Sequence, residues 1–180
     1  MEMTAETVYL TRGALVIRDL GAADVEPIVA GEIAQGWRGA TCEKYDMRLR
    51  DAAAGRCIAL CASLAGAPVG YINLYFKAFP PYEKTDWPEI VDFGVLEKHR
   101  RGGIGTALMD AAEALAAARS DTVCIGVGLH SGYGSAQRMY VKRGYIPDGS
   151  GVWYQNRPLE PYTSCCNDDD LVLYLSKELD

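Results

Sequence analysis

A basic cluster, Lys98–Arg101, stands directly before a run that contains Gly102, Gly103 and Gly105. A mostly apolar run, Ile90–Leu96, precedes the cluster, and a helix-like pattern follows the glycines. The first N–H groups of a helix lack intrahelical acceptors, and the helix dipole favours negative charge there. Glycines let that backbone approach a ligand closely. The stretch therefore predicts a strand, a glycine turn and a helix start that together bind a phosphate group.

The spacing within this loop excludes the two common nucleotide fingerprints. It contains neither G-x-x-x-x-G-K-S/T nor G-x-G-x-x-G, which excludes a P-loop and a dinucleotide-binding turn. It does contain R-x-x-G-x-G, as Arg100, Gly103 and Gly105. At a strand-to-helix junction this motif resembles the GNAT superfamily of N-acetyltransferases, whose hallmark is Q/R-x-x-G-x-G/A. The resemblance implies that the loop binds the pyrophosphate of acetyl-CoA.

A second motif, A-x-x-L/M-Y-x-K/R-x-G-F/Y, strengthens the resemblance. Its residues are Ala136, Met139, Tyr140, Lys142, Gly144 and Tyr145. One departure is Tyr133, which stands where relatives often have Asn. The family's order of elements matches over residues 14–177. The resemblance implies an α/β fold of GNAT type in one domain, 1–180, with a mixed, strongly twisted β-sheet flanked by helices on both faces.

The implied cofactor contacts lie in one segment of the chain. We expect the backbone at Phe93 and Val95 to pair with the pantetheine arm like an added strand. Arg138 and Lys142 are candidates for the cofactor's other phosphate, with plain surface exposure as the alternative. The residues expected to hold the pyrophosphate are Arg100, Arg101, Gly102, Gly103, Ile104, Gly105 and Thr106.

Acyl transfer from a thioester to an amine requires a proton acceptor and a proton donor. A lysine-type amine, with a pKa near 10.4, arrives mostly protonated, so a base must take its proton. The resemblance implies Glu89 as that base, and Asp92 is the alternative. Three residues apart on an undistorted strand, the two would point to opposite faces. Tyr140 matches the family's thiolate-side tyrosine, and its hydroxyl suits protonation of a thiolate.

Periodicity indicates the elements that must position these residues. We expect a helix from an N-cap at Asp24 to about Gln35, and Trp37, Tyr45 and Arg48 are candidate acceptor contacts, with packing or surface exposure as the alternative. Residues 148–168 are rich in Gly, Pro, Asn and aromatic residues, and the sequence assigns them no role. The other expected elements are strands 14–18, 56–64, 68–76, 90–96, 122–129 and 171–175, a strand that starts at 145, and helices 42–54, 104–119 and 135–143. Glycines at alternate positions of strand 122–129 would admit a packed helix or the cofactor arm.

Composition bounds the protein class. The chain has 180 residues, 49% of them hydrophobic and 23% charged, which is typical of one globular domain. The formal net charge of −6 argues against nonspecific nucleic-acid binding. No apolar run approaches the roughly 20 residues that span a bilayer. Glu2 and Glu6, without a basic region, are not typical of a signal peptide. We expect a cytoplasmic protein with no membrane partner.

The remaining residue types favour no metal or histidine chemistry. The six cysteines have no metal-ligand spacing, so no metal is expected. We expect Cys165 and Cys166 to be free thiols. His99 and His130 are interpreted as non-catalytic. The acidic run Asp168–Asp170 is either a solvated turn or a rim that attracts a cation.

These observations predict an acetyl-CoA-dependent N-acetyltransferase that moves an acetyl group to a primary amine by direct attack in a ternary complex. A small cationic acceptor molecule is favoured. The alternatives are a protein N-acetyltransferase, a non-catalytic acyl-CoA-binding module, and an enzyme for another acyl-CoA. An exposed strand edge near the C-terminus would permit a homodimer.

Overall fold

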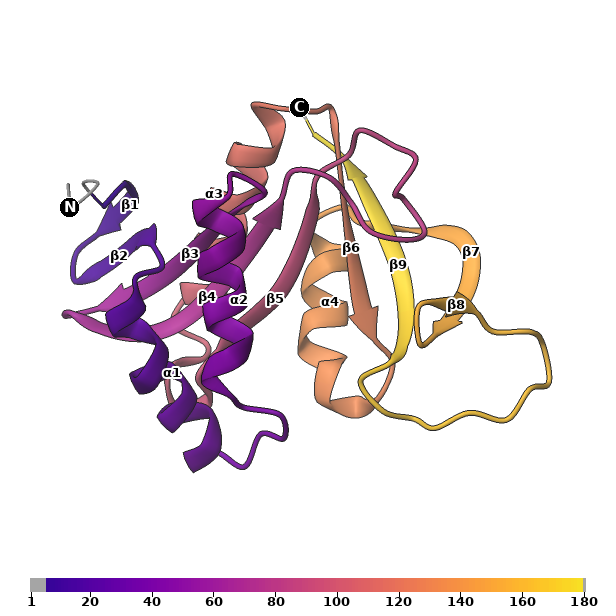
Figure 1. The fold of residues 1–180 in the computed structure, drawn as a ribbon, viewed down its shortest axis with the longest axis horizontal. Helices are drawn as coiled ribbons and strands as arrows, with labels where there is room; N and C mark the ends of the chain where they lie inside the picture. Colours follow the sequence, from indigo (N-terminus) through magenta and orange to yellow (C-terminus); the bar gives the residue numbers. More distant parts are fainter. Residues whose placement is uncertain (1–5, 180) are drawn as a thin grey trace. The chain divides into compact units, whose positions relative to one another are not determined.

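Strands and helices alternate along the computed structural model, which describes residues 6–179 (Figure 1). Glu2, on which part of the N-terminal prediction rests, lies outside the described residues. Within the described chain, no helix has the length and apolar character needed to cross a membrane. The elements in order are β1 (Val8–Arg12), β2 (Leu15–Asp19), α1 (Ala22–Ala34), α2 (Cys42–Ala53), β3 (Cys57–Leu64), β4 (Ala67–Tyr75), β5 (Glu89–Val95), η1 (Glu97–His99), α3 (Ile104–Ala117), β6 (Thr122–Gly128), η2 (Ser131–Tyr133), α4 (Gly134–Lys142), β7 (Ile146–Tyr154), β8 (Arg157–Pro158) and β9 (Leu171–Glu178).

The chain divides into two compact units. The first consists of the described part of Met1–Tyr75 together with Val91–Leu115. The second consists of Phe76–Ile90 and the described part of Ala116–Asp180. Strand β5 therefore contributes its last five residues to the first unit and its first two to the second.

The sheet of the first unit has the strand order β1-β2-β3-β4-β5. The first four strands are joined by antiparallel pairing. The strands predicted at 56–64 and 68–76 are confirmed as β3 and β4. They form an antiparallel hairpin whose turn places Ala65 and Gly66 at φ 50° and 85°. Two successive positive φ values match the turn type whose twist suits a tight hairpin. Strand β1, which sequence reasoning missed, pairs with β2.

Helices cover both faces of this sheet. Tyr71 of β4 packs in a core cluster with Val25 and Ile28 of α1 and with Tyr45 of α2. Its neighbour Gly70 points the other way, where an added Cβ would lie 3.3 Å from a methyl group of Leu108 in α3. Successive residues of a strand face opposite sides, so α3 lies on the face opposite α1 and α2. The helices on both faces confirm the predicted layering for this unit.

The start of α1 corrects the prediction that Asp24 is an N-cap. The helix begins at Ala22, with Gly21 as N-cap. The Asp24 carboxylate reaches back to accept the Gly21 N–H at 2.9 Å and also binds both Nη atoms of Arg18 at 2.7 Å. In a capping box, the side chain of the third helical residue accepts the backbone N–H of the N-cap residue. Asp24 makes this contact, so it is a partner of the N-cap and not the N-cap itself. The sequence signal was therefore real, but it was three residues out of place.

The second unit continues the ladder in the order β5-β6-β9-β7-β8. Glu89 and Ile90 pair in parallel with Cys124 and Ile125 of β6, while β9 pairs antiparallel with β6. The sheet is therefore mixed, as predicted. Part of the segment 148–168 forms β7 and β8. The expectation of an exposed edge is wrong for β9, which pairs with both β6 and β7. The C-terminal strand thus offers no free edge, because its backbone groups are satisfied on both sides.

The prediction of free thiols at Cys165 and Cys166 is confirmed. The thiols of Cys57, Cys61 and Cys124 are buried, and those of Cys165 and Cys166 are exposed and free. Burial raises the pKa of the Cys61 thiol to about 12. A thiol of such a pKa stays protonated near neutral pH, so these buried cysteines pack as small apolar residues.

Candidate active site

The loop between β5 and α3 has the geometry of an anion cradle. Arg101 and Gly103 adopt left-handed backbone conformations, with φ 65° and 80°. The Ala107 N–H donates to the Gly103 carbonyl oxygen at 3.0 Å, which starts the helix. The N–H groups ahead of Ala107 in the first turn therefore precede any intrahelical acceptor. Gly102, Gly103 and Thr106 are exposed, so this backbone faces solvent.

The three glycines of the loop have different roles. A Cβ at Gly103 would meet no heavy atom within 4 Å, so its positive φ is what favours glycine there. A Cβ at Gly105 would lie 3.2 Å from the ring of Phe93, which makes that position a packing requirement. A Cβ at Gly102 would be in ordinary contact with the His99 carbonyl oxygen, at 3.7 Å. The predicted pantetheine and pyrophosphate residues, Phe93 to Thr106, all lie in the first unit, whereas Arg138 and Lys142 lie in the second.

Arg100 is tied to its own loop. Its Nε donates to the Val95 carbonyl oxygen at 3.1 Å, and its Nη1 lies 3.6 Å from Oε1 of Glu97. Its guanidinium also lies over the ring of Trp37, 5.3 Å from the centroid. These contacts close the loop from within. Arg101 is exposed and is the more available of the two positive charges.

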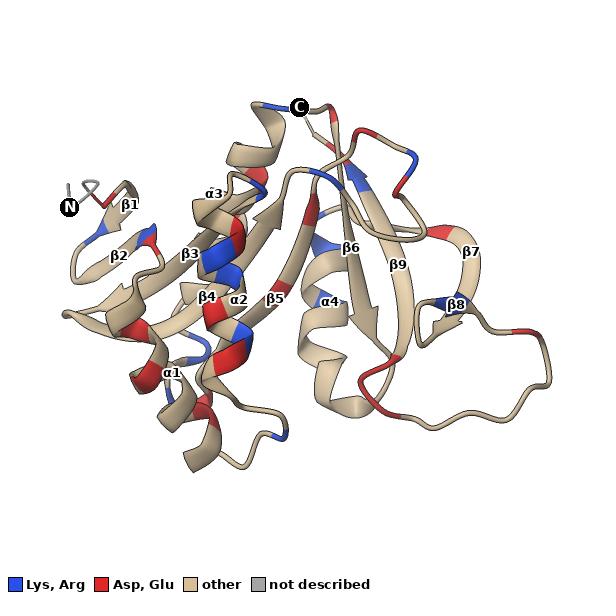
Figure 2. Cartoon of the chain, in the orientation of Figure 1, with Lys and Arg blue, Asp and Glu red and all other residues tan. Residues whose placement is uncertain are grey.

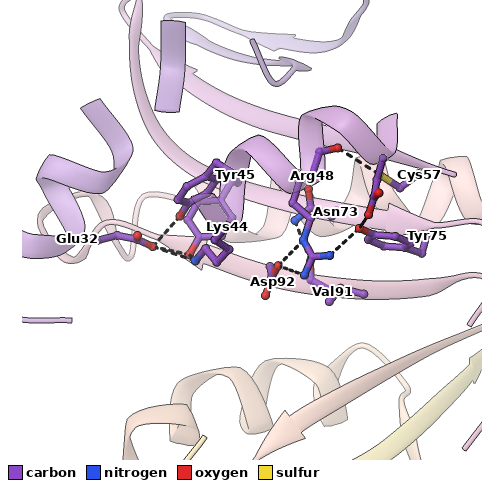
Figure 3. Close-up of polar contacts among 11 residues, drawn as sticks. Glu32, Lys44, Tyr45, Arg48, Cys57, Asn73, Tyr75, Val91 and Asp92 are labelled. Atoms are coloured by element: carbon purple, nitrogen blue, oxygen red, sulfur yellow. Dashed lines mark hydrogen bonds and ion pairs between the residues drawn. The ribbon is translucent and has the colours of Figure 1, made fainter. Parts of the chain in front are cut away.

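A polar network joins α2 to β5 beside this loop. Arg48 Nε donates to Oδ2 of Asp92 at 2.7 Å, and Arg48 Nη1 donates to the hydroxyl of Tyr75 at 2.6 Å (Figure 3). Tyr75 in turn donates to Asp51. Asp92 has φ 51°, so the regular extended backbone of β5 is interrupted there. The Arg48 guanidinium thus binds the side chain of Asp92, the residue at which the extended backbone of β5 is interrupted.

A buried carboxylate of α1, that of Glu32, contacts the first turn of α2. Glu32 is 1% exposed, and its Oε1 accepts the hydroxyl groups of Tyr45 at 2.8 Å and Tyr71 at 2.6 Å (Figure 3). Burial, followed by the neighbouring tyrosine and carboxylate, raises the pKa of Tyr45 far above its ordinary value. Of the candidate acceptor contacts, Tyr45 is therefore a core residue, and the packing alternative holds. Trp37 contacts the loop, and Arg48 contacts β5.

Glu32 was missed by sequence reasoning although a signal existed. Val25, Ile28 and Val29 form the buried stripe of α1, and Glu32 continues it by one helical turn. A charged residue on such a stripe must have polar partners, since an unpaired buried charge is costly. Those partners come from α2 and β4, which no local pattern could name.

In the second unit, Tyr140 lies buried in α4 at 4% exposure, with its ring 5.8 Å from that of Tyr145. Burial, and then the neighbouring Tyr133, raises the pKa of Tyr140 well above its ordinary value. The hydroxyl therefore stays protonated across the physiological range. A protonated hydroxyl is what a proton donor requires.

Glu89 begins β5 and is 6% exposed. Its Oε2 accepts the backbone N–H of Phe79 at 2.8 Å, so the carboxylate also anchors the loop that precedes the strand. Its negative charge is felt by Tyr174, whose pKa is raised to about 12 by burial first and by Glu89 next. The residue combines a structural contact with a buried negative charge.

Side chains occupy the space over the two glycines of β6. A Cβ at Gly128 would lie 2.4 Å from the ring of Tyr133, and a Cβ at Gly126 would lie 3.1 Å from Val172 and Tyr174. The close neighbours of these glycines are therefore side chains from η2 and β9. The sequence alone indicated a packed helix or the cofactor arm at this place. Tyr133, at the position where relatives often have Asn, thus packs its ring on β6.

The acidic run before β9 is engaged with this region. Asp169 Oδ1 lies 3.0 Å from Nε2 of His130 and accepts the Tyr133 hydroxyl at 2.9 Å. The two donors lower the pKa of Asp169, His130 most and Tyr133 next. Asp169 of the acidic run therefore binds side chains at the η2 turn and holds that turn in place. His130 has a structural partner, in keeping with its non-catalytic interpretation.

The exposed side of α4 carries a hollow of about 320 Å³. Its lining residues are Gln137, Arg138, Val141 and Lys142. Arg138 and Lys142, the candidates for a second phosphate, thus share one face of the helix. Among residues 6–179, no group of three or more His, Cys, Asp and Glu side chains is placed to hold a metal ion.

A family described as "Acetyltransferase (GNAT) family" matches residues 30–145, which is more than half of the chain. The chain belongs to the GNAT acetyltransferase family. The matched range contains the end of α1, all of α2 and the cradle, and it ends at Tyr145, the last residue of the second motif. No curated protein matches the chain.

Solved structures share this GNAT fold at low sequence identity. Ard1 from Thermoplasma volcanium is 23% identical, with a TM-score of 0.68, and the match covers 92% of this chain and 98% of that one. The yncA structure from Salmonella typhimurium, solved with acetyl-CoA, is 14% identical, with a TM-score of 0.65 and coverage of 93% and 95%. The Salmonella typhimurium acetyltransferase that modifies the N-terminal serine of ribosomal protein L7/L12 is 14% identical, with a TM-score of 0.69 and coverage of 97% and 100%. At these identities the likeness shows the fold alone.

The GNAT cradle fits a pyrophosphate by its own geometry. The exposed first turn of α3 offers backbone N–H groups, and the left-handed Gly103 leaves open space in front of them. Exposed Arg101 adds positive charge. These are the features with which a helix start binds phosphate without a dedicated side chain.

Proposed function

We propose that this GNAT protein is an acetyl-CoA-dependent N-acetyltransferase of a small cationic primary amine. The observation that carries the proposal is the cradle at the start of α3, where the left-handed Gly103 opens the helix terminus to solvent. A helix start with exposed N–H groups and a neighbouring arginine is suited to the pyrophosphate of CoA. The proposal treats residues 1–180 as one acetyltransferase domain and places it in the cytoplasm.

The cofactor would bind in three places. The backbone of Gly102–Thr106 holds the pyrophosphate, with Arg100 and Arg101 contributing charge. The backbone at Phe93 and Val95 pairs with the pantetheine arm. Arg138 and Lys142, which line the hollow on α4, meet the remaining phosphate.

The reaction would be direct attack of the acceptor nitrogen on the thioester in a ternary complex. Holding the two reactants together supplies much of the rate. Glu89 takes a proton from the acceptor ammonium, with Asp92 as the alternative base. Tyr140, whose hydroxyl is protonated near neutral pH, protonates the departing thiolate.

A cationic acceptor is supported by the negative formal charge of the chain, −6. Acidic surface raises the local concentration of cations. Acidic and basic residues alternate along α2, so both signs of charge are present at the helix beside β5 (Figure 2). A protein amine is the second acceptor class, since one of the similar structures is that of an acetyltransferase that modifies the N-terminal serine of ribosomal protein L7/L12.

The test is a calorimetric titration with acetyl-CoA followed by a thiol-release screen over polyamines, amino acids, aminoglycosides and N-terminal peptides. We expect saturable binding and thiol release with one class of small cationic amine. Thiol release with N-terminal peptides alone would show that the acceptor is a protein amine and not a small cationic amine. Binding without any release would favour an acyl-CoA-binding module, and absence of binding would overturn the assignment of the cradle. Titration with dephospho-CoA tests Arg138 and Lys142, because only their contact depends on the missing phosphate.

A further inference from the structure

The side chain of Lys44 lies in a site made for an ammonium group. Its Nζ is 3.7 Å from Oε1 of the buried Glu32 (Figure 3). It is also 3.3 Å from the hydroxyl oxygen of Tyr71. It also lies 4.6 Å from the ring centroid of Tyr45 and 4.9 Å from that of Tyr71. Two aromatic rings and a carboxylate are the groups that recognise a primary ammonium ion. The protein therefore presents one of its own amines in the way it would present an acceptor.

The site leaves the amine reachable and provides a proton acceptor. The Lys44 side chain is 28% exposed, whereas that of Glu32 is 2% exposed. Oε2 of Glu32 is buried and has no hydrogen-bond partner among the described residues. A carboxylate oxygen without a hydrogen-bond partner is an available acceptor for a hydrogen of the neighbouring amine.

The same site touches the strand that leads to the cradle. A Cβ at Gly94 would lie 2.7 Å from the hydroxyl oxygen of Tyr71, so this hydroxyl packs directly on the backbone of β5. Gly94 stands between Phe93 and Val95, the two residues whose backbone is assigned to the pantetheine arm. The Tyr71 hydroxyl thus lies between the Lys44 amine and this segment.

We propose that Lys44 is an internal acetyl acceptor, modified by the acetyl-CoA that the same molecule binds. The inference rests on the proposed function, since it needs the donor thioester beside β5. The Lys44 ammonium gives one proton to the Glu32 carboxylate, which keeps it. The neutral nitrogen then attacks the thioester carbonyl carbon, the C–N bond forms and the C–S bond breaks. The second nitrogen proton leaves with the sulfur, so the products are acetyl-Lys44 and free CoA.

The experiment measures acetylation of each lysine by peptide mass spectrometry after incubation of the full chain with acetyl-CoA. Lys77 and Lys84 are exposed and report the rate of uncatalysed acetylation. We expect Lys44 to react at least about tenfold faster than they do, because the amine is held in place. The first-order rate constant of Lys44 acetylation, at a fixed acetyl-CoA concentration, should not change on dilution of the protein, because the step is intramolecular. A Lys44 rate constant equal to those of Lys77 and Lys84, or one that rises with protein concentration, would overturn the inference.

Two variants separate the site from general lysine reactivity. Glu32→Gln keeps the size of the side chain and removes its charge, and we expect it to bring the Lys44 rate down to that of Lys77. Lys44→Arg keeps the positive charge and should remove the fast-modified peptide while leaving the slow ones unchanged. Calorimetric titration with acetyl-CoA is run on the same samples. Absence of binding means that the proposed function fails, whereas binding without preferential Lys44 acetylation refutes this inference alone.

Discussion

The anion cradle and the α2–β5 network are both polar regions of the first unit, but they are assembled in different ways. The cradle is made within one short segment, where Arg100 contacts Val95 and Ala107 contacts Gly103. The network joins residues far apart in the chain: Arg48 binds Asp92, 44 positions away, and Tyr75, 27 positions away. A local site depends on backbone conformation, whereas a long-range site depends on the packing of whole elements. Substitutions in the two regions should therefore affect different properties.

The largest effect is expected from Gly103→Asp. A carboxylate at the mouth of the cradle would face the pyrophosphate, and like charges placed together cost several kcal/mol, or roughly several hundredfold in affinity. Gly13→Asp is the matched control, because Gly13 also has a positive φ, 58°, and no heavy atom within 4 Å of an added Cβ. Calorimetry with acetyl-CoA should show lost binding for the first variant only. Equal affinities would mean that the cradle does not bind the cofactor.

Tyr140→Phe should reduce turnover far more than donor affinity. Removing a general acid costs on the order of 100-fold in kcat. The ring remains to pack against Tyr145, so the fold should be retained. Steady-state kinetics together with acetyl-CoA titration separates the two quantities. Turnover at the level of the unchanged protein would exclude the acid role of this tyrosine.

Glu89→Gln tests the base while keeping the structural contact. The amide oxygen can still accept the Phe79 N–H, so the preceding loop should stay in place. We expect kcat/KM to fall by on the order of 100-fold near neutral pH, with the loss growing as pH falls, because a larger share of acceptor is then protonated. A pH profile parallel to that of the unchanged protein would move the base to Asp92 or to water.

Arg48→Met should act mainly on stability, in contrast to the variants of the cradle. Removing the guanidinium leaves Asp92, whose side chain is 26% exposed, without its partner. We expect a loss of about 2 kcal/mol in the free energy of unfolding, because breaking a partly buried ion pair strands one charge. Arg56→Met, which breaks an exposed pair with Asp51, is the control and should change little. Urea unfolding measures both, and a smaller loss for Arg48 than for Arg56 would contradict this account.

The smallest effect is expected from Asp169→Asn, which tests a long-range contact at the surface. The lowered pKa of Asp169 means that its contacts stabilise the fold above the ordinary Asp pKa of about 3.9, and that this stability disappears as pH falls through the lowered value. The side chain is 69% exposed, and solvent screening limits the contribution to about 0.5 kcal/mol. Unfolding curves at pH 7 should differ by this amount and should converge in strong acid. A constant difference across pH would exclude the charge as its cause.

Local patterns predicted most of the elements that surround the site. The β3–β4 hairpin, helix α2 and the strand-turn-helix around Gly103 follow from alternation, helical spacing and glycine positions, all of which act between near neighbours. The same reasoning misplaced the start of α1, because it treated Asp24 as the cap and not as a partner of the cap. It also missed β1 and β8, which are short strands whose pairing depends on a neighbouring strand.

The sequence by itself determined the GNAT cradle, since its glycines and arginines act within one turn of the chain. It also determined that Tyr140 belongs to a helix that follows a strand. Only the tertiary structure decided that Glu32 is a buried carboxylate shared by two tyrosines, that Lys44 sits over their rings, and that Arg48 fixes Asp92. These contacts join different elements, and a charged residue in a helix carries no local record of the partner that will neutralise it. Their positions are set when α1, α2, β4 and β5 pack together.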